Sequence, residues 1–488
     1  MDKDMGVAGR STVQTKIVAT IGPASDSIDC LVKLIEAGVS VFRLNSAHNS
    51  IGTLNKTLAS ITRASSSTER YVGILLDLAG PKIRLGSLPG DHLYCGKDSF
   101  LRFIRGEGEA VVDGNRAELT VTYESLLDEV KVGNKIMLAD GTVQARVEKV
   151  TKDFADCRVL QAGTIRSRQG VNLPGVKLNV SCLGPEDKSF VEWAVTQNID
   201  FIGLSFVRSP EDVMLLKDMI ALLGSDIQVV AKIEKPEAIE QLEQIVEVAD
   251  AVMVARGDLG VEIDIARIAV VQKEIISVCR RFGKPVVIAT QMLDSMQHSS
   301  VPTRAEVTDV ANAVIDGADA CMLSGETAIG EYPVESVEMM RQIALNTYPV
   351  CRNTPKTKCY LNNQYISNPI TEHTVRSAGQ LAESLDARIL AVVTRSGLTT
   401  LLLSKNRFMV PTVGIASDEK VLRRMCLYWG VIPLFATSDN EDTEALSNLI
   451  IDWGKMNGSL SSGDRLVIIN GTGISRSAHN QIIVYDLD

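Results

Sequence analysis

Short, almost uninterrupted apolar runs recur along the first two thirds of the chain, and nearly every run ends in polar or charged positions. Eight of them share this form: 16–22, 39–45, 71–78, 200–207, 228–234, 251–258, 285–291 and 318–326. Strands of a parallel sheet that is covered on both faces have this continuous apolar character. Helical patterns separate most of the runs; in one, Thr303 and Glu306 have capping-box spacing and Gly317 follows the last apolar positions. Strand followed by helix, eight times, predicts a (β/α)8 barrel.

The pattern is interrupted once, between Ala79 and Asn198, by shorter strand-like runs that glycines punctuate. This interruption predicts a small β domain inserted into a barrel loop, where it can act as a lid. After about residue 346, apolar strands and helical patterns alternate again, as in an open α/β unit. The predicted fold is therefore α/β, with a (β/α)8 barrel domain A at 1–80 and 180–345, an inserted small β-barrel lid domain B at 81–179, and a C-terminal open α/β domain C at 346–488.

The polar ends of the barrel runs are the candidate site, because catalytic residues of such barrels project from the C-terminal ends of the strands. A strand that leaves the core and meets solvent explains any one of these positions, whereas eight on one rim favour a functional site. The candidates are Thr20, Arg43, Asn45, His48, Asp77, Ser205, Arg208, Lys232, Glu234, Arg256, Asp258, Thr290, Gln291, Ser324 and Glu326.

The residue types at these ends indicate a metal and an anionic substrate. Glu234 and Asp258, from adjacent strands, can bind one divalent cation such as Mg²⁺, although salt bridges to nearby cations are the alternative interpretation. Arg43, Arg84, Lys232 and Arg256 suit a phosphate or a phosphate with a carboxylate. Arg256 is equally compatible with a structural role.

Composition narrows the function classes. The 60 acidic and 50 basic residues give a net charge of −10, and 45% of the residues are apolar. We therefore exclude a disordered scaffold and expect neither nucleic-acid nor membrane binding. The nine cysteines have no metal-site or redox spacing, and no secretory leader or membrane span is recognisable. The expected location is the cytoplasm.

Long motifs then carry a family resemblance. They are KIVATIGPAS, RLN-x-x-H, LD-x-x-GP-x-IR, AKIE, MVARGDLGVEI, ATQMLDSM, PTRAE-x-x-DVANAV-x-DG-x-D and MLSGETA-x-G-x-YP. In this order they resemble the pyruvate kinases, strongly over about residues 12–345 and more weakly beyond. The resemblance implies transfer of the phosphoryl group of phosphoenolpyruvate to ADP, giving pyruvate and ATP in the last step of glycolysis. It also implies Mg²⁺ or Mn²⁺, effector sites in the C-terminal domain and a homotetramer.

The resemblance assigns roles to the candidate residues. Lys232 matches the lysine that stabilises the transition state, and Glu234 and Asp258 match the metal ligands. The remaining matches are Arg43 for the phosphate shared by both substrates; Thr290 with the backbone of Gly257 and Asp258 for the substrate carboxylate; Thr290, Ser324 and Glu326 for a proton relay; and Asn45, His48 and Arg84 for the nucleotide phosphates.

Several positions depart from the family pattern around a monovalent-cation site. That site would use Asn45, a hydroxyl at position 47, Asp77 and the carbonyl of residue 78, but position 47 is alanine. Lys82 stands where K⁺-dependent members have glutamate, and Leu78 stands where they have threonine. The resemblance thus implies that Lys82 replaces the ion and that K⁺ is not required.

Two more departures concern the nucleotide and the effector. Glu186 occupies a position where the family often has lysine, which leaves that nucleotide contact in doubt. The segment 394–400 resembles the family's effector phosphate loop through Thr394, Arg395, Ser396, Gly397, Thr399 and Thr400, but Leu398 replaces a frequent arginine or polar residue. We expect a phosphorylated activator, a monophosphate rather than a bisphosphate.

Two alternatives stay open at the level of the sequence. One is another Mg²⁺-dependent, enolate-forming barrel enzyme, such as a class II aldolase-like or pyruvate-phosphate-type lyase. The other is a metabolite-sensing pseudo-enzyme, which the altered positions 47 and 186 favour and the intact Lys232, Glu234, Asp258 and Thr290 oppose. Formation of ATP from ADP separates them.

Overall fold

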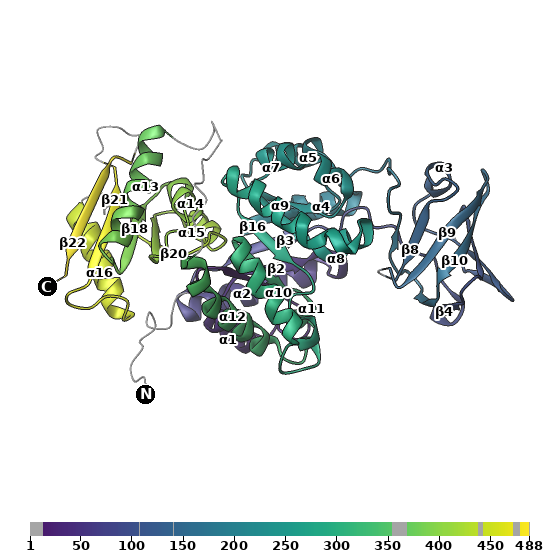
Figure 1. Cartoon of the computed structure of the whole chain (residues 1–488), viewed down its shortest axis with the longest axis horizontal. Coiled ribbons are helices and arrows are strands. Elements are labelled where there is room, and N and C mark those ends of the chain that lie inside the picture. Colours follow the sequence, from purple (N-terminus) through teal and green to yellow (C-terminus); the bar gives the residue numbers. More distant parts are fainter. Residues whose placement is uncertain are drawn as a thin grey trace.

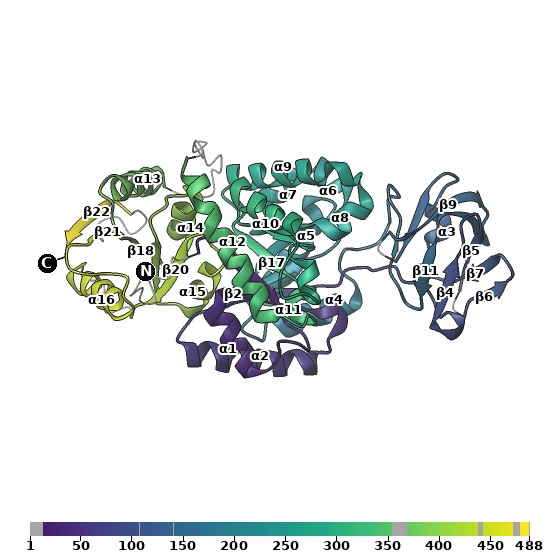
Figure 2. The ribbon, with the colours of Figure 1, turned by 60° about the horizontal axis from the view of Figure 1, so that its bottom comes forward.

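The computed structural model describes residues 13–106, 108–139, 141–353, 368–437, 443–471 and 479–487. Three units follow one another in space, with the barrel in the middle, the inserted unit at one end and the C-terminal unit at the other (Figures 1 and 2). In the described residues no helix is long and apolar enough to cross a membrane. The eight cysteines described are all free, and six of them are buried.

Eight parallel strands close into a barrel in the order β1-β17-β16-β15-β14-β13-β3-β2. Their bounds are β1 (Lys16–Thr20), β2 (Val39–Asn45), β3 (Gly73–Asp77), β13 (Phe201–Leu204), β14 (Gln228–Ile233), β15 (Ala251–Ala255), β16 (Val286–Ala289) and β17 (Ala320–Leu323). Most of their residues are buried, because helices cover the outside and side chains fill the inside. All eight predicted strands are present, and the predicted fold class is confirmed.

Helices pack around the barrel. They are α1 (Ile28–Ala37), α2 (Ile51–Thr68), α4 (Pro185–Ala194), α5 (Pro210–Leu222), α6 (Pro236–Glu240), α7 (Leu242–Val248), α8 (Arg256–Glu262), α9 (Ile268–Arg281), α10 (Arg304–Asp316), α11 (Gly325–Ala328) and α12 (Pro333–Asn353). The predicted capping box is present on α10, where Thr303 and Glu306 satisfy each other's backbone N–H groups, and Gly317 ends the helix with φ 97°.

The inserted unit lies between β3 and α4 and contains nine strands and one short α-helix among its described residues. They are β4 (His92–Cys95), β5 (Phe100–Ile104), β6 (Val111–Asp113), β7 (Arg116–Leu119), α3 (Leu126–Glu129), β8 (Lys135–Leu138), β9 (Val143–Val150), β10 (Phe154–Gln161), β11 (Gly163–Arg166) and β12 (Val171–Asn172). Seven strands form a mixed sheet in the order β12-β8-β9-β10-β5-β7-β6, and β11 pairs with β4. This unit has a core of its own.

The C-terminal unit is a five-stranded sheet with helices. Its elements are α13 (Pro369–Ser384), β18 (Ile389–Val393), α14 (Leu398–Lys405), β19 (Thr412–Ala416), α15 (Glu419–Met425), β20 (Val431–Phe435), α16 (Thr443–Met456), β21 (Arg465–Asn470) and β22 (Gln481–Asp486). The strand order is β20-β19-β18-β21-β22, and only the β21–β22 pair is antiparallel. From β18 the chain adds β19 and β20 on one side and then β21 and β22 on the other, so the order in which strands are added to the sheet reverses between β18 and β21.

The C-terminal unit closes the end of the barrel opposite the candidate site. Side chains from inside the barrel, such as Val18 and Leu75, form one apolar cluster with Leu422 and Met425 of α15. Buried ion pairs flank this contact: Asp200, just before β13, binds Arg423 at 2.9 Å, and Asp319, just before β17, binds Lys405 at 2.6 Å.

Candidate active site

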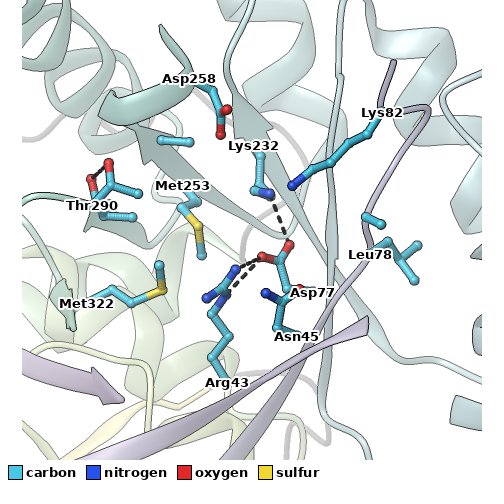
Figure 3. Close-up of a pocket in the computed structure, with 13 residues that line it drawn as sticks. Arg43, Asn45, Asp77, Leu78, Lys82, Lys232, Met253, Asp258, Thr290 and Met322 are labelled. Atoms are coloured by element: carbon cyan, nitrogen blue, oxygen red, sulfur yellow. Dashed lines mark hydrogen bonds and ion pairs between the residues drawn. The ribbon is translucent and has the colours of Figure 1, made fainter. Parts of the chain in front are cut away.

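A pocket opens at the C-terminal ends of the barrel strands (Figure 3). Its lining residues come from six strands and from the segments that follow them: Arg43, Asn45, Asp77, Leu78, Ala79, Lys82, Lys232, Met253, Ala255, Asp258, Ala289, Thr290 and Met322. Seven of the site residues singled out in the sequence are therefore in this pocket, although they are up to 247 positions apart in the chain.

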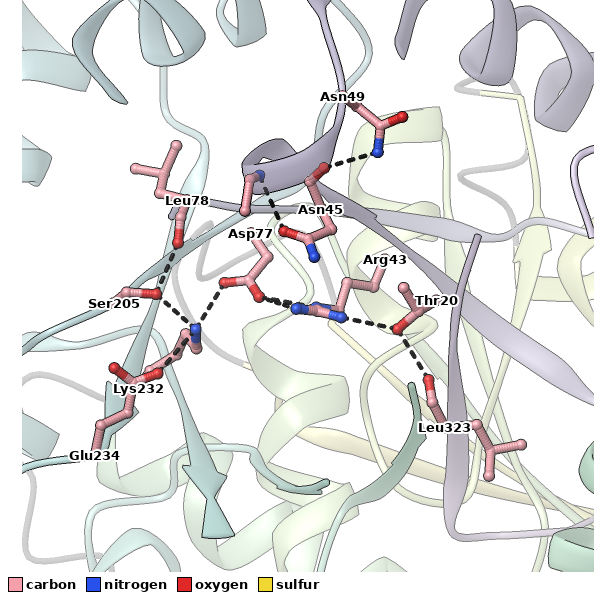
Figure 4. Close-up of polar contacts among 11 residues, drawn as sticks. Thr20, Arg43, Asn45, Asn49, Asp77, Leu78, Ser205, Lys232, Glu234 and Leu323 are labelled. Carbon is pink, nitrogen blue, oxygen red and sulfur yellow. Dashed lines mark hydrogen bonds and ion pairs between the residues drawn. The ribbon is translucent and has the colours of Figure 1, made fainter. Parts of the chain in front are cut away.

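Lys232 is at the centre of a buried polar network (Figure 4). Its Nζ donates to the Ser205 hydroxyl at 2.6 Å and forms ion pairs with Glu234 Oε1 at 2.9 Å and Asp77 Oδ1 at 3.2 Å. Ser205 in turn donates to the carbonyl of Leu78 at 2.7 Å. The ammonium is thus fixed by groups from three strand ends.

The charges in this network determine its protonation. Burial alone lowers the pKa of Lys232, but Asp77 and Glu234 outweigh it, so the pKa lies above its ordinary value. Burial raises the pKa of Asp77, yet Lys232 and Arg43 hold it below its usual value. At neutral pH, Lys232 is therefore an ammonium and Asp77 a carboxylate.

Glu234 and Asp258 are the acidic pair proposed for a metal. Glu234 is buried, and its Oε2 accepts the backbone N–H of Phe206 at 3.0 Å. Asp258 is exposed on α8, and its side chain points into the pocket (Figure 3). Burial raises the pKa of Glu234, Lys232 opposes that shift, and the negative charge of Asp258 adds to it. A divalent cation between the two carboxylates would remove this repulsion, so the donor set fits such an ion.

Nothing in the described residues provides a larger metal cage, since they contain no group of three or more His, Cys, Asp or Glu side chains placed to hold an ion. A two-carboxylate site suits a cation that keeps waters and takes substrate oxygens. Mg²⁺ prefers that kind of coordination.

Arg43 lies across the pocket from Asp258. Its guanidinium donates to Asp77 Oδ2 from both Nε and Nη2, at 2.8 and 2.5 Å, and from Nη1 to the Thr20 hydroxyl at 3.0 Å. Thr20 donates onward to the carbonyl of Leu323 at 2.9 Å. The charge of Arg43 therefore stays at the pocket surface in a fixed orientation.

Thr290 lines the pocket on the side away from Lys82 and Leu78 (Figure 3) and has a left-handed backbone, with φ 65°. Its hydroxyl accepts the N–H of Gly257 at 2.7 Å, which brings the start of α8 against the end of β16. Arg256 donates to the carbonyl of Thr290 at 2.8 Å and pairs with Asp309 at 2.6 Å. Arg256 is thus bound within the protein, which supports the structural alternative.

Ser324 and Glu326 follow β17. The carboxylate of Glu326 is buried and accepts the backbone N–H groups of Ser324 at 2.7 Å and Leu293 at 3.0 Å, while burial raises its pKa. The Ser324 hydroxyl is buried, with no hydrogen-bond partner among the described residues. A free hydroxyl beside a carboxyl that protonates easily can take part in proton transfer.

Of the three residues predicted to bind the nucleotide phosphates, only one lines the pocket. Asn45 lines the pocket, but its side-chain oxygen accepts the N–H of Ala47 at 3.1 Å. Arg84 lies at the start of the inserted unit, donates to the carbonyl of Arg168 at 3.2 Å and is not in the pocket lining. The backbone of His48 belongs to the 3-10 turn Ser46–His48, and its side chain lies outside the described part.

The loop after β18 has the turn expected of the effector segment. Gly397, with φ 82°, precedes α14, and its N–H donates to the Thr394 hydroxyl at 3.0 Å. The Thr399 hydroxyl and His479 Nδ1 are 3.2 Å apart. This loop lies where the strand order of the sheet reverses, between β18 and β21, which is the usual ligand-binding position of open α/β sheets.

Two residues make contacts at the site for which no role was predicted, although one of them, Ser205, was a strand-end candidate. Ser205 holds Lys232, and its place at a strand end was the only signal. Asp187 accepts the N–H groups of Gly80 at 3.3 Å and Gly184 at 3.1 Å, so one buried carboxyl binds both chain segments that connect the inserted unit to the barrel. Its position in the first turn of α4 gave no hint of that contact.

Comparison with known proteins gives a consistent result. The family model "Pyruvate kinase, barrel domain" matches residues 12–337, and "Pyruvate kinase, alpha/beta domain" matches residues 372–485. A pyruvate kinase of Geobacillus stearothermophilus is 40% identical over 96% of this chain and 79% of its own length, and one of Thermotoga maritima is 36% identical over 97% and 99%. The crystal structure of a pyruvate kinase from Cryptosporidium parvum superposes with a TM-score of 0.87 at 33% identity, covering 98% of this chain and 97% of that one.

Proposed function

This chain belongs to the pyruvate kinase family of phosphotransferases, whose substrates are phosphoenolpyruvate and ADP, and we propose that the barrel pocket is where it transfers the phosphoryl group. The observation that carries the proposal is the buried ammonium of Lys232, which three strand ends fix beside Arg43 and an acidic pair. The domains A (1–80 and 180–345), B (81–179) and C (346–488) are part of the same proposal.

Lys232 and Arg43 stabilise the charge on the transferring group. Phosphoryl transfer depends mainly on positioning and on electrostatic stabilisation of the equatorial oxygens. Lys232 stays protonated because of its acidic neighbours, so it presents a full positive charge without a change in protonation. Arg43 offers the same charge to the phosphate from the other side.

Thr290 and the start of α8 bind the substrate carboxylate. The backbone N–H groups at Gly257 and Asp258 lie in the first turn of that helix, where partial positive charge favours an anion. The N–H of Gly257 donates to the Thr290 hydroxyl in this structure, and the substrate carboxylate would take over that hydrogen bond. The enolate that remains after transfer must gain a proton at carbon. Thr290, Ser324 and Glu326 are proposed to supply it, with Glu326 as the buried carboxyl whose pKa burial raises.

Glu234 and Asp258 would hold the divalent cation, for which the family has a general requirement, and Mg²⁺ or Mn²⁺ fits their oxygen ligands. When bound, that ion supplies Lewis-acid charge stabilisation for the phosphate oxygens. Phe206 holds Glu234 in place through its backbone N–H. Asn45, His48 and Arg84 are proposed for the nucleotide phosphates, with Arg84 brought to the pocket by closure of domain B.

We further propose that Lys82 replaces a monovalent cation, so that K⁺ is not required. Lys82 lines the pocket with Asn45, Asp77 and Leu78, and its ammonium points inward beside Lys232 (Figure 3). Ala47 has no hydroxyl to offer an ion. A second fixed cation in this small space makes K⁺ binding electrostatically unfavourable.

Regulation and assembly complete the proposal. Thr394, Arg395, Ser396, Gly397, Thr399 and Thr400 would bind the phosphate of a phosphorylated activator at the loop after β18. A homotetramer in the cytoplasm is the expected assembly and location.

A steady-state assay tests the function directly. The purified protein, phosphoenolpyruvate, ADP and Mg²⁺ should yield ATP and pyruvate in equal amounts, with pyruvate followed by coupled NADH oxidation. Lys232→Met should lower kcat by several orders of magnitude while phosphoenolpyruvate still binds. Absence of ATP formation by the folded wild-type protein would refute the proposal.

A further inference from the structure

The residue after Glu234 forms a buried ion pair that the proposed reaction does not use. Lys235 Nζ lies 2.5 Å from Glu262 Oε1, with side-chain exposures of 9% and 2%. Glu262 is the last residue of α8, and Asp258 is the third residue of the same helix. The pair therefore links the strand end that carries one proposed metal ligand to the helix that carries the other.

Phe206 makes the third side of this arrangement. Its φ of 65° is a left-handed conformation that aromatic residues rarely adopt, and in it the backbone N–H donates to Glu234 at 3.0 Å. The ammonium of Lys235 lies 4.2 Å from the centre of the Phe206 ring. Lys235 thus contacts both supports: the helix of Asp258 and the residue that holds Glu234.

Glu234 and Asp258 need such support because their negative charges repel each other before a cation binds. The helix of Asp258 has only seven residues, and Asp258 itself is exposed. Along the chain, 23 residues separate the two carboxylates, so the Lys235–Glu262 pair is a much shorter connection between them.

Stability alone is a weak reason for a buried ion pair here. Apolar side chains of similar volume often replace such pairs without loss, since desolvation offsets most of the attraction. Residues behind metal ligands commonly fix the geometry of those ligands instead.

We propose that Lys235 is a positioning residue, whose ion pair with Glu262 and contact with Phe206 hold Glu234 and Asp258 at the separation that one divalent cation requires. The inference rests on the proposed function, because it takes those two carboxylates as the metal ligands.

Binding of Mn²⁺ to the substrate-free enzyme tests the proposal without depending on turnover. Free Mn²⁺ is measured by electron paramagnetic resonance during a titration of wild type, Lys235→Met and Glu262→Gln. We expect the dissociation constant to rise about 10- to 100-fold in both variants. Lys235→Arg, which keeps the charge, should fall between wild type and Lys235→Met.

Lys217→Met is the matched control. Lys217 on α5 pairs with Asp250 at 2.8 Å on the outside of the same barrel, away from the pocket lining. Its removal should leave Mn²⁺ affinity unchanged. In steady state, Lys235→Met should raise the Mg²⁺ concentration for half-maximal rate and recover most of kcat when Mg²⁺ saturates.

Mn²⁺ affinity within twofold of wild type in both Lys235→Met and Glu262→Gln would overturn the inference, as would an equal loss in Lys217→Met. Glu234→Gln and Asp258→Asn distinguish a failure of the Lys235 proposal from a failure of the proposed metal site. If these variants weaken Mn²⁺ binding and Lys235→Met does not, the positioning role of Lys235 is refuted and the proposed metal site stands. If they also bind Mn²⁺ like wild type, the proposed metal site itself is refuted.

Discussion

Replacing Lys232 with methionine should destabilise the fold as well as abolish turnover, because the ammonium neutralises two buried carboxylates. At an effective dielectric of about 20, its attraction is about 6 kcal/mol to Glu234 at 2.9 Å and about 5 kcal/mol to Asp77 at 3.2 Å. Desolvation of the ammonium offsets much of this. Removal of one partner from a buried pair typically costs about 3–5 kcal/mol.

The loss should depend on pH in a defined direction. Burial already raises the pKa of Glu234, and Lys232 is the group that opposes this shift, so its removal raises that pKa further. A carboxyl whose folded pKa exceeds its unfolded pKa stabilises the fold at low pH, and that stabilisation is lost as pH rises through the folded pKa. Lys232→Met should therefore differ most from wild type at pH 8 and least at pH 5.

Thermal unfolding at both pH values measures the effect, with an expected decrease in Tm on the order of 10 °C at pH 8. The double variant Lys232→Met/Glu234→Gln should recover a large part of it, since the uncompensated charge is gone. Lys217→Met serves as the ion-pair control. A Tm for Lys232→Met within a degree of wild type at both pH values would show that the network does not carry the charge balance described.

Three further predictions test the proposed site and its regulation. Asp258→Asn should raise the Mg²⁺ requirement sharply and reduce turnover, and coincident metal titrations for variant and wild type would place the ion elsewhere. Rates in KCl and in tetramethylammonium chloride at matched ionic strength should agree, whereas Lys82→Glu should lose activity and regain part of it in K⁺, incompletely because Ala47 lacks a ligand oxygen. A screen of sugar phosphates and nucleotides should find a monophosphate that shifts the phosphoenolpyruvate saturation curve, and a screen without any shift would reject the effector loop at 394–400.

Local sequence signals were sufficient for the elements of the barrel. Continuous apolar runs predicted all eight strands, because a strand that is covered on both faces is apolar at almost every position and is therefore easy to recognise. The run 39–45 matches β2 at both ends, whereas the other seven were predicted to end too far along the chain: 200–207 was expected for the strand that the structure has as Phe201–Leu204. The residues after Leu204 belong to the site instead, and the left-handed Phe206 cannot continue a strand.

The contacts within the site could not be predicted in the same way. Position at a strand end indicated that Lys232 and Glu234 face one rim, but the pairing of Lys232 with Asp77 depends on the order and register of β3, β13 and β14. The sequence also assigned Arg84 to the nucleotide, whereas in the structure its guanidinium binds the carbonyl of Arg168 in the inserted unit. Both residues belong to the inserted unit (81–179), so this hydrogen bond does not contradict the nucleotide role, which stays a prediction.

At the closed end of the barrel, the burial of charged side chains could not be predicted from the sequence. Four charged residues meet there, and their residue types alone predict exposure to solvent. They are Asp200, Asp319, Lys405 and Arg423. In the structure Asp200, Asp319 and Lys405 are buried and Arg423 is half-buried at the contact between barrel and C-terminal unit. The two aspartates stand at the starts of β13 and β17. Burial raises the pKa of Asp200 to about 6, and Arg423 only partly offsets this. Pairs of this kind fix the docking of two units because neither charge is tolerated alone in the apolar surroundings. The same two strands are followed at the site by Ser205 and Ser324, so the docking of the C-terminal unit and the geometry of the site depend on opposite ends of four-residue strands.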